Sequence, residues 1–123
     1  MYFYVHDKFV KEKQYAKRLN KMSLKLNDLD IFHDKAEITP VNTIENVVND
    51  VLSDKRYKHL VVVGDDNTAS EAINALVKSR TLDHKPVFGI IPFRSSRVAD
   101  SLGIPEDVEQ ACVTISRRKL ETV

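Results

Sequence analysis

The sequence is poor in three features that would each point to a particular class of protein. Cysteine occurs once, as Cys112, so no disulfide can form within the chain, and a reducing compartment suits it. No apolar run approaches the roughly 20 residues that a membrane-spanning helix needs. The net charge is only +1, so no overall basic excess indicates nucleic-acid binding. We therefore expect a soluble, cytoplasmic protein without a signal peptide.

Several catalytic signatures are missing as well. The sequence contains no Walker-type phosphate loop, no Cys/His spacing typical of a metal site and no nucleophile elbow. Cys112 lies among apolar residues of a predicted helix, and we expect it to be buried and inert. With 123 residues the chain is long enough for one domain with a core, and we treat 1–123 as a single domain.

Short apolar runs alternate with helical patterns along the chain. Strands are predicted over 1–5, 36–39, 60–63 and 86–91, and a further extended segment over 119–123. Helices are predicted over 9–27, from an N-cap at Asn42 to 52, from 69 to 79, from Ser95 or Ser96 to a C-cap at Gly103, and from Pro105 to 116. This alternation predicts a three-layer α/β fold: an open, mostly parallel sheet with helices on both faces.

The central feature is a strand, a polar turn and a helix. The apolar strand over 60–63 ends at Gly64, and four polar residues follow it, namely Asp65, Asp66, Asn67 and Thr68. In an open α/β sheet, ligands bind at the carboxyl ends of strands. The two carboxylates together would also suit a hard cation such as Mg²⁺. The same residue types are good helix caps, so a ligand role and a capping role both stay open.

A second polar turn follows the strand over 86–91. It contains Arg94, Ser95, Ser96 and Arg97. Because the carboxyl ends of parallel strands share one edge of a sheet, we expect the two polar turns to converge. Guanidinium groups bind phosphate through paired hydrogen bonds, so this turn predicts an anion site. The plainer interpretation is a solvated surface turn with two arginines.

These segments resemble the diacylglycerol kinase catalytic family, whose relatives include the NAD kinases. The family has Gly-Gly-Asp-Gly-Thr after an apolar strand. Gly64, Asp66 and Thr68 match that pattern, whereas Asp65 and Asn67 stand in place of glycines. Glu71 and Asn74 match the helix that follows in the family.

A second resemblance to the family lies downstream. The segments Gly-Ile-Ile-Pro over 89–92 and Leu-Gly-Ile-Pro over 102–105 are similar to the two flanks of another family landmark. Between them, Arg94, Arg97 and Val98 replace the glycine, asparagine and aspartate of the family. The turn after the first strand is often Asn-Pro-x-x-Gly in the family and contributes to nucleotide binding. Here it reads His6-Asp7-Lys8. From the carboxyl end of a strand His6 could contact a ligand, but the favoured interpretation is an exposed loop histidine.

The resemblance implies the nucleotide-binding half of a lipid kinase, which transfers the γ-phosphate of ATP to a lipid hydroxyl. It implies Mg²⁺ as the metal, with Asp66 beside it, and no catalytic residue is assigned. The nucleotide-binding residues that we infer are Gly64, Asp65, Asp66, Asn67, Thr68, Glu71, Arg94, Ser95, Ser96 and Arg97. Such kinases hold the lipid in a second, β-rich domain, so we expect this chain to be a piece that lacks it. The lipid would bring the whole protein to a membrane surface, and homodimer formation is left open.

Two other interpretations stay open. The first is a degenerate, non-catalytic binding or regulatory module of the same fold. Asp65 favours it, because a carboxylate ~4 Å from a phosphate is repelled by about 4 kcal/mol at an effective dielectric constant near 20. The second is a flavodoxin-like or receiver-like α/β module, which would leave the downstream segment from 89 to 105 unexplained.

Overall fold

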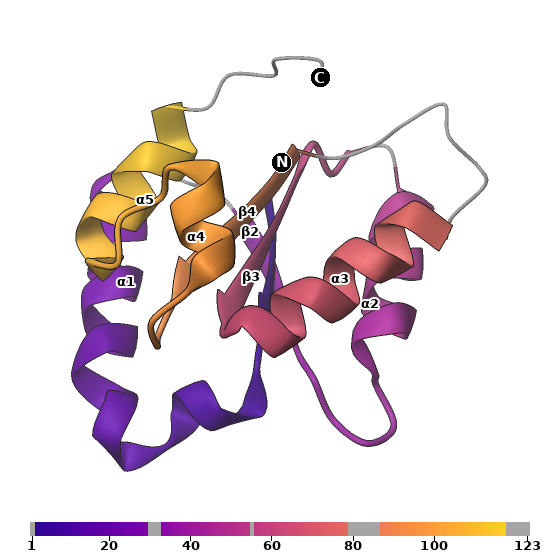
Figure 1. The fold of residues 1–123 in the computed structure, drawn as a ribbon, viewed down its shortest axis with the longest axis horizontal. Helices are drawn as coiled ribbons and strands as arrows, with labels where there is room; N and C mark the ends of the chain where they lie inside the picture. The colour runs from indigo at the N-terminus through magenta and orange to yellow at the C-terminus, as the bar shows by residue number, and fades with distance from the viewer. Residues whose placement is uncertain (1, 30–32, 55, 79–86, 118–123) are drawn as a thin grey trace.

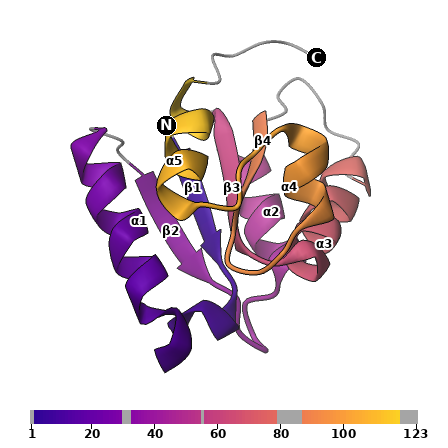
Figure 2. The same ribbon diagram turned by 60° about the vertical axis from the view of Figure 1, so that its left-hand side comes forward.

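The fold is an open α/β sandwich built on a parallel sheet. The computed structural model describes residues 2–29, 33–54, 56–78 and 87–117. Its strands are β1 (Tyr2–His6), β2 (His33–Glu37), β3 (His59–Gly64) and β4 (Val87–Pro92). They are all parallel and lie in the order β2-β1-β3-β4 (Figure 2).

The helices form layers on the two faces of this sheet. They are α1 (Ala16–Asp28), α2 (Ile44–Leu52), α3 (Asp66–Lys78), α4 (Arg97–Leu102) and α5 (Val108–Arg117). Helices α1 and α5 cover one face, and α2 and α3 cover the other (Figure 1). The predicted α/β class and three-layer arrangement are thereby confirmed. Within the described ranges, none of the helices has the length and apolar character that crossing a bilayer requires.

The central strand β3 is buried on both faces, as its apolar run predicts. Val61 and Val63 belong to the core on the α1 and α5 side, whereas Leu60 and Val62 belong to the core under α2 and α3. This alternation follows from the two-residue period of a strand. Every residue of β3 is buried, so the strand fixes the position of the turn that follows it.

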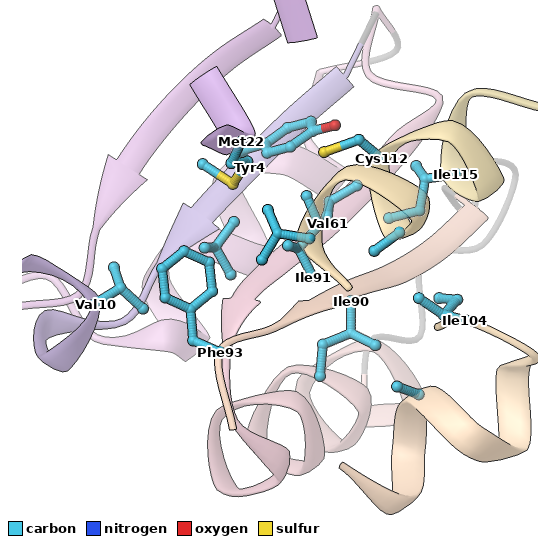
Figure 3. Close-up of a cluster of buried hydrophobic side chains, with 14 of the residues drawn as sticks. Tyr4, Val10, Met22, Val61, Ile90, Ile91, Phe93, Ile104, Cys112 and Ile115 are labelled. Carbon is cyan, nitrogen blue, oxygen red and sulfur yellow. The ribbon is translucent and has the colours of Figure 1, made fainter. Parts of the chain in front are cut away.

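Cys112 lies in the core between α5 and the sheet. Figure 3 shows its sulfur beside the ring of Tyr4 on β1, with Met22 of α1 nearby. The side chain is fully buried, and burial raises the pKa of the thiol to about 12. The expected buried position of this residue is confirmed.

The first predicted helix is wrong in its first third. The segment expected as one helix over 9–27 contains two short 3-10 helices, η1 (Lys8–Lys11) and η2 (Lys13–Tyr15), before α1 begins. Glu12 between them has an extended backbone, with ψ of 147°. The Asp7 carboxylate accepts a hydrogen bond from the Phe9 amide at 3.4 Å and caps η1. The helical pattern gave no indication of this break.

Other boundaries also differ from the prediction. Thr43, not Asn42, caps α2, because the Thr43 hydroxyl accepts from the Asn46 amide at 3.3 Å. Helix α5 begins at Val108, and Asp107 accepts from the Glu109 amide at 2.8 Å just before it. The second strand lies earlier than 36–39. His6 is buried as the last residue of β1 and is not an exposed loop residue.

The short helix after the second polar turn matches the prediction. The Ser96 hydroxyl accepts from the Ala99 amide at 2.9 Å, which makes Ser96 the N-cap of α4. Gly103 ends the helix in the left-handed region, with φ of 70°, where glycine carries no steric penalty. The predicted extended segment over 119–123 lies outside the described residues, as do position 79 at the end of one predicted helix and position 86 at the start of one predicted strand.

Two leucines of α1 test this packing. Leu26 is 1% exposed, whereas Leu24 on the outer side of the same helix is 57% exposed. We predict that Leu26→Ala lowers the free energy of unfolding by about 2–5 kcal/mol, because it leaves a cavity in the core. The matched variant Leu24→Ala is expected to change it by less than about 0.5 kcal/mol. Urea denaturation followed by circular dichroism measures both, and equal losses would contradict the packing of α1.

Candidate functional site

Three turns meet at the carboxyl edge of the sheet, after β1, β3 and β4. The Asp7 amide donates to the Val63 carbonyl at 2.9 Å, and the Phe93 amide donates to the Gly64 carbonyl at 3.0 Å. A Cβ atom on Gly64 would lie 2.8 Å from the Cβ of Asp7. Glycine is therefore required here by the close approach of the β1 turn. The expected convergence of the two polar turns is found, and the β1 turn joins them.

Asp65 caps α3 and faces a cation. Its Oδ1 accepts hydrogen bonds from the amide and the hydroxyl of Thr68, at 3.2 and 3.3 Å. Its Oδ2 lies 3.4 Å from Nη1 of Arg94. Thr68 is buried, and its hydroxyl also contacts the Asp7 carboxylate, so one proton is shared between the two carboxylates. The hydroxyl therefore connects the turn after β3 with the turn after β1.

Asp66 is the first residue of α3, and it caps a different helix. Its carboxylate accepts from the Ser96 hydroxyl at 2.5 Å and from the amides of Arg97 and Val98 at 2.8 and 3.4 Å. These amides begin α4, where the helix dipole favours a negative charge. Burial alone would raise the pKa of Asp66. The hydrogen bonds and the positive charge of Arg97 outweigh that effect and lower the pKa below its usual value.

Arg94 connects the β4 turn to the segment before α1. Its guanidinium carbon lies 3.9 Å from the ring centroid of Phe9, and Nε donates to the Tyr15 hydroxyl at 2.9 Å. The rings of Phe9 and Tyr15 pack edge to face, with 5.2 Å between their centroids. Together with Asp65, these two aromatic residues hold an arginine that is exposed on its remaining side.

The side chains of the remaining predicted residues are exposed at the surface. Asn67, Ser95 and Arg97 belong to the polar turns themselves, and the charge of Arg97 acts on Asp66. Glu71 is also exposed and lines a groove of about 320 Å³ between α2 and α3, which Asn74 shares. The structure therefore does not bring Glu71 to the edge where Asp65 and Arg94 meet.

Sequence reasoning missed three residues of the edge: Asp7, Phe9 and Tyr15. Phe9 and Asp7 also line an open pocket of about 480 Å³ with Lys8, Lys11 and Glu12. The unusual His6-Asp7-Lys8 turn was the only signal for Asp7. Phe9 and Tyr15 lie within the helix predicted over 9–27. Residues six positions apart in a helix lie on different faces, so the prediction did not bring the two rings together.

A magnesium ion does not fit at Asp66 in this arrangement. Three donors of the α4 segment already surround the Asp66 carboxylate, so a cation would compete with them for its oxygens. Asp65 forms an ion pair with the guanidinium group of Arg94. Across the described residues, no three His, Cys, Asp or Glu side chains are grouped closely enough to hold a metal.

Comparison with known proteins places this chain in a family. The diacylglycerol kinase catalytic domain family matches residues 6–123, and the chain belongs to it. A solved diacylglycerol kinase from Bacillus anthracis str. Sterne superimposes with a TM-score of 0.76 at 18% identity, covering 94% of this chain and 42% of that one. A structure from the same organism described as "a putative diacylglycerol kinase" gives 0.75 at 19% identity, covering 96% and 40%.

At these identities, the two structures establish the shared fold alone. The present chain spans about two-fifths of their length. A comparison with curated proteins finds no match.

The lowered pKa of Asp66 predicts that the stability of the protein depends on pH. A carboxylate with a lowered native pKa stabilises the fold above its unfolded-state pKa, about 3.9. That stability is lost as the pH falls through the lower native value. We predict that the native protein loses stability below about pH 4 through this group, whereas Asp66→Asn is less stable at neutral pH and loses less on acidification. Urea denaturation from about pH 3 to 7 measures this.

The control is Asp50→Asn, which changes an exposed carboxylate on α2. It is expected to follow the pH dependence of the native protein. If Asp66→Asn also follows it, the α4 cap does not carry this dependence.

Proposed function

We propose that this chain is the nucleotide-binding domain of a lipid kinase-like protein. In the whole protein, the γ-phosphate of ATP would pass to a lipid hydroxyl, in the cytoplasm and at the membrane surface. One observation carries the proposal: the turns after β1, β3 and β4 meet around Gly64 in a chain of this family. The ligand site of an open α/β sheet lies at this edge.

Different groups at the carboxyl edge of the sheet would contact different parts of a polyphosphate. Arg94 presents a guanidinium group with one exposed side, which suits a phosphate oxygen pair. Helix α3 is 13 residues long, and its amino-terminal end lies next to Arg94. The partial positive charge of this helix end would also attract a phosphate. ATP would bring Mg²⁺, whose charge offsets that of the phosphates. For a phosphate to bind Arg94, its contact with Asp65 must open.

We infer no phosphoryl transfer by the 123-residue chain alone. The matched structures are more than twice as long. A kinase of this type needs an acceptor site for the lipid hydroxyl, aligned with the phosphate. We assign no residue of this chain to that site and propose that a second domain supplies it.

A second candidate function is a non-catalytic binding or regulatory module. The way Arg94 is held favours it: Asp65, Tyr15 and Phe9 already occupy the guanidinium group. Asp65 also covers the Thr68 amide, a donor that a phosphate would otherwise meet. In this case the replaced glycines have closed the phosphate site.

Titration with Mg·ATP, followed by amide NMR, distinguishes the two functions. The first predicts shifts of the amides over 64–68 and 94–97 at millimolar nucleotide. We expect Arg94→Ala to weaken binding by about tenfold or more, because hydrogen bonds to charged groups contribute about 1.5–3 kcal/mol. Arg56→Ala, which removes an exposed arginine paired with Asp54, is expected to bind like the native chain.

A triple variant tests the closed-site alternative. Restoring glycine through Asp65→Gly, Asn67→Gly and Arg94→Gly reopens the turns. Binding by this variant but not by the native chain would support the non-catalytic module. Absence of binding by both would contradict nucleotide binding as the function of this edge. Circular dichroism verifies that each variant is folded.

A further inference from the structure

The segment that leads into and forms α1 is strongly basic, although the whole chain has a net charge of only +1. Residues 8–28 contain six lysines and Arg18, against two acidic residues, Glu12 and Asp28. Among the described residues, the only ion pair of this segment joins Lys11 to Glu37. Most of its positive charge therefore faces water.

The outer side of α1 combines this charge with an exposed apolar residue. Lys17, Lys21 and Leu24 follow the i, i+4, i+7 spacing that places them on one face of a helix. Met22 and Leu26, on the opposite side, are buried in the core. Leu24 is 57% exposed, and Arg18 flanks the same surface. We call Lys17, Arg18, Lys21 and Leu24 the basic face.

The opposite layer of the molecule has the opposite charge. Helices α2 and α3 carry four acidic residues, Glu45, Asp50, Asp66 and Glu71, against the single basic residue Lys78. Helix α1 carries four basic residues against Asp28. The sheet separates these layers (Figure 1). A charged planar partner would therefore attract one side of the molecule and repel the other.

We propose that the basic face docks on the surface of an anionic lipid bilayer, with α1 toward the lipid and α2 and α3 away from it. Lysine ammonium groups act as point charges on long stems that reach lipid phosphates. Leu24 would enter the boundary between headgroups and acyl chains, as apolar residues of interfacial helices do. A nucleic-acid surface would favour arginine forks and stacking aromatic residues, which the basic face lacks apart from Arg18.

This orientation deepens the proposed peripheral location, and it bears on the candidate site. The segment over 8–15 joins the carboxyl edge of the sheet directly to α1. It contributes three further lysines, at positions 8, 11 and 13. Docking through α1 would therefore hold the turns that contain Asp7 and Gly64 close to the lipid surface.

Vesicle flotation without nucleotide tests the proposal independently of the proposed nucleotide binding. We expect the 123-residue chain to bind phosphatidylcholine vesicles that contain phosphatidylglycerol, and not pure phosphatidylcholine vesicles. Binding should weaken as salt rises, because salt screens surface charges. Each basic residue at such a surface changes the partition coefficient about fivefold, so Lys17→Ala with Lys21→Ala should lower it roughly 25-fold.

Two further variants complete the test. Leu24→Ser is expected to lower the partition coefficient several-fold, whereas Lys78→Ala, an exposed lysine on the opposite layer, should leave it unchanged. Equal binding to both kinds of vesicle, or a double variant that binds like the native chain, would overturn the proposal. So would a duplex oligonucleotide that binds through Lys17 and Lys21 and displaces the vesicles. Circular dichroism confirms the fold of each variant.

Discussion

The carboxylate of Asp66 holds together two turns that lie thirty residues apart in the chain. It begins α3, yet its hydrogen bonds go to Ser96, Arg97 and Val98, where α4 begins. A buried or half-buried carboxylate is stable only when such donors surround it. Because α4 is only six residues long, the position of this helix beside β4 depends on its caps. Asp66 therefore ties the turn after β3 to the beginning of α4 at the carboxyl edge of the sheet.

Two departures from the family pattern complement each other. Asp65 and Arg94 both stand where the family has glycine, and in this structure they form an ion pair at 3.4 Å. The added negative charge is therefore offset at the place where it arises. Phe9 and Tyr15 add a stacking contact and a hydrogen bond to the same guanidinium group. Side chains therefore interact at positions where the family pattern has glycine, in a chain that belongs to the diacylglycerol kinase catalytic domain family.

Local patterns predicted the fold well where a single period dominated. The apolar run of β3 and the spacing of Ile44, Val47 and Val51 in α2 each allow one interpretation, and both elements are found. The cap at Ser96 and the left-handed Gly103 were also predictable from residue type. The break at Glu12 was not, because contacts of Phe9 and Tyr15 with a residue some eighty positions away accompany it. For Asp66, the sequence left capping and ligand binding open, since the distant donors from Ser96 onward cannot be seen in a local window.

The reactivity of Cys112 depends on how often the core opens. Its thiol lies between α5 and Tyr4 of the sheet, and burial raises its pKa to about 12. Thiolates, not thiols, attack alkylating reagents. In the native state, burial keeps the reagent away from Cys112, and the raised pKa keeps the sulfur protonated. Labelling of this single cysteine therefore requires α5 to lift from the sheet or the chain to unfold. The rate of modification by iodoacetamide would report that opening directly, from a probe that the protein already carries.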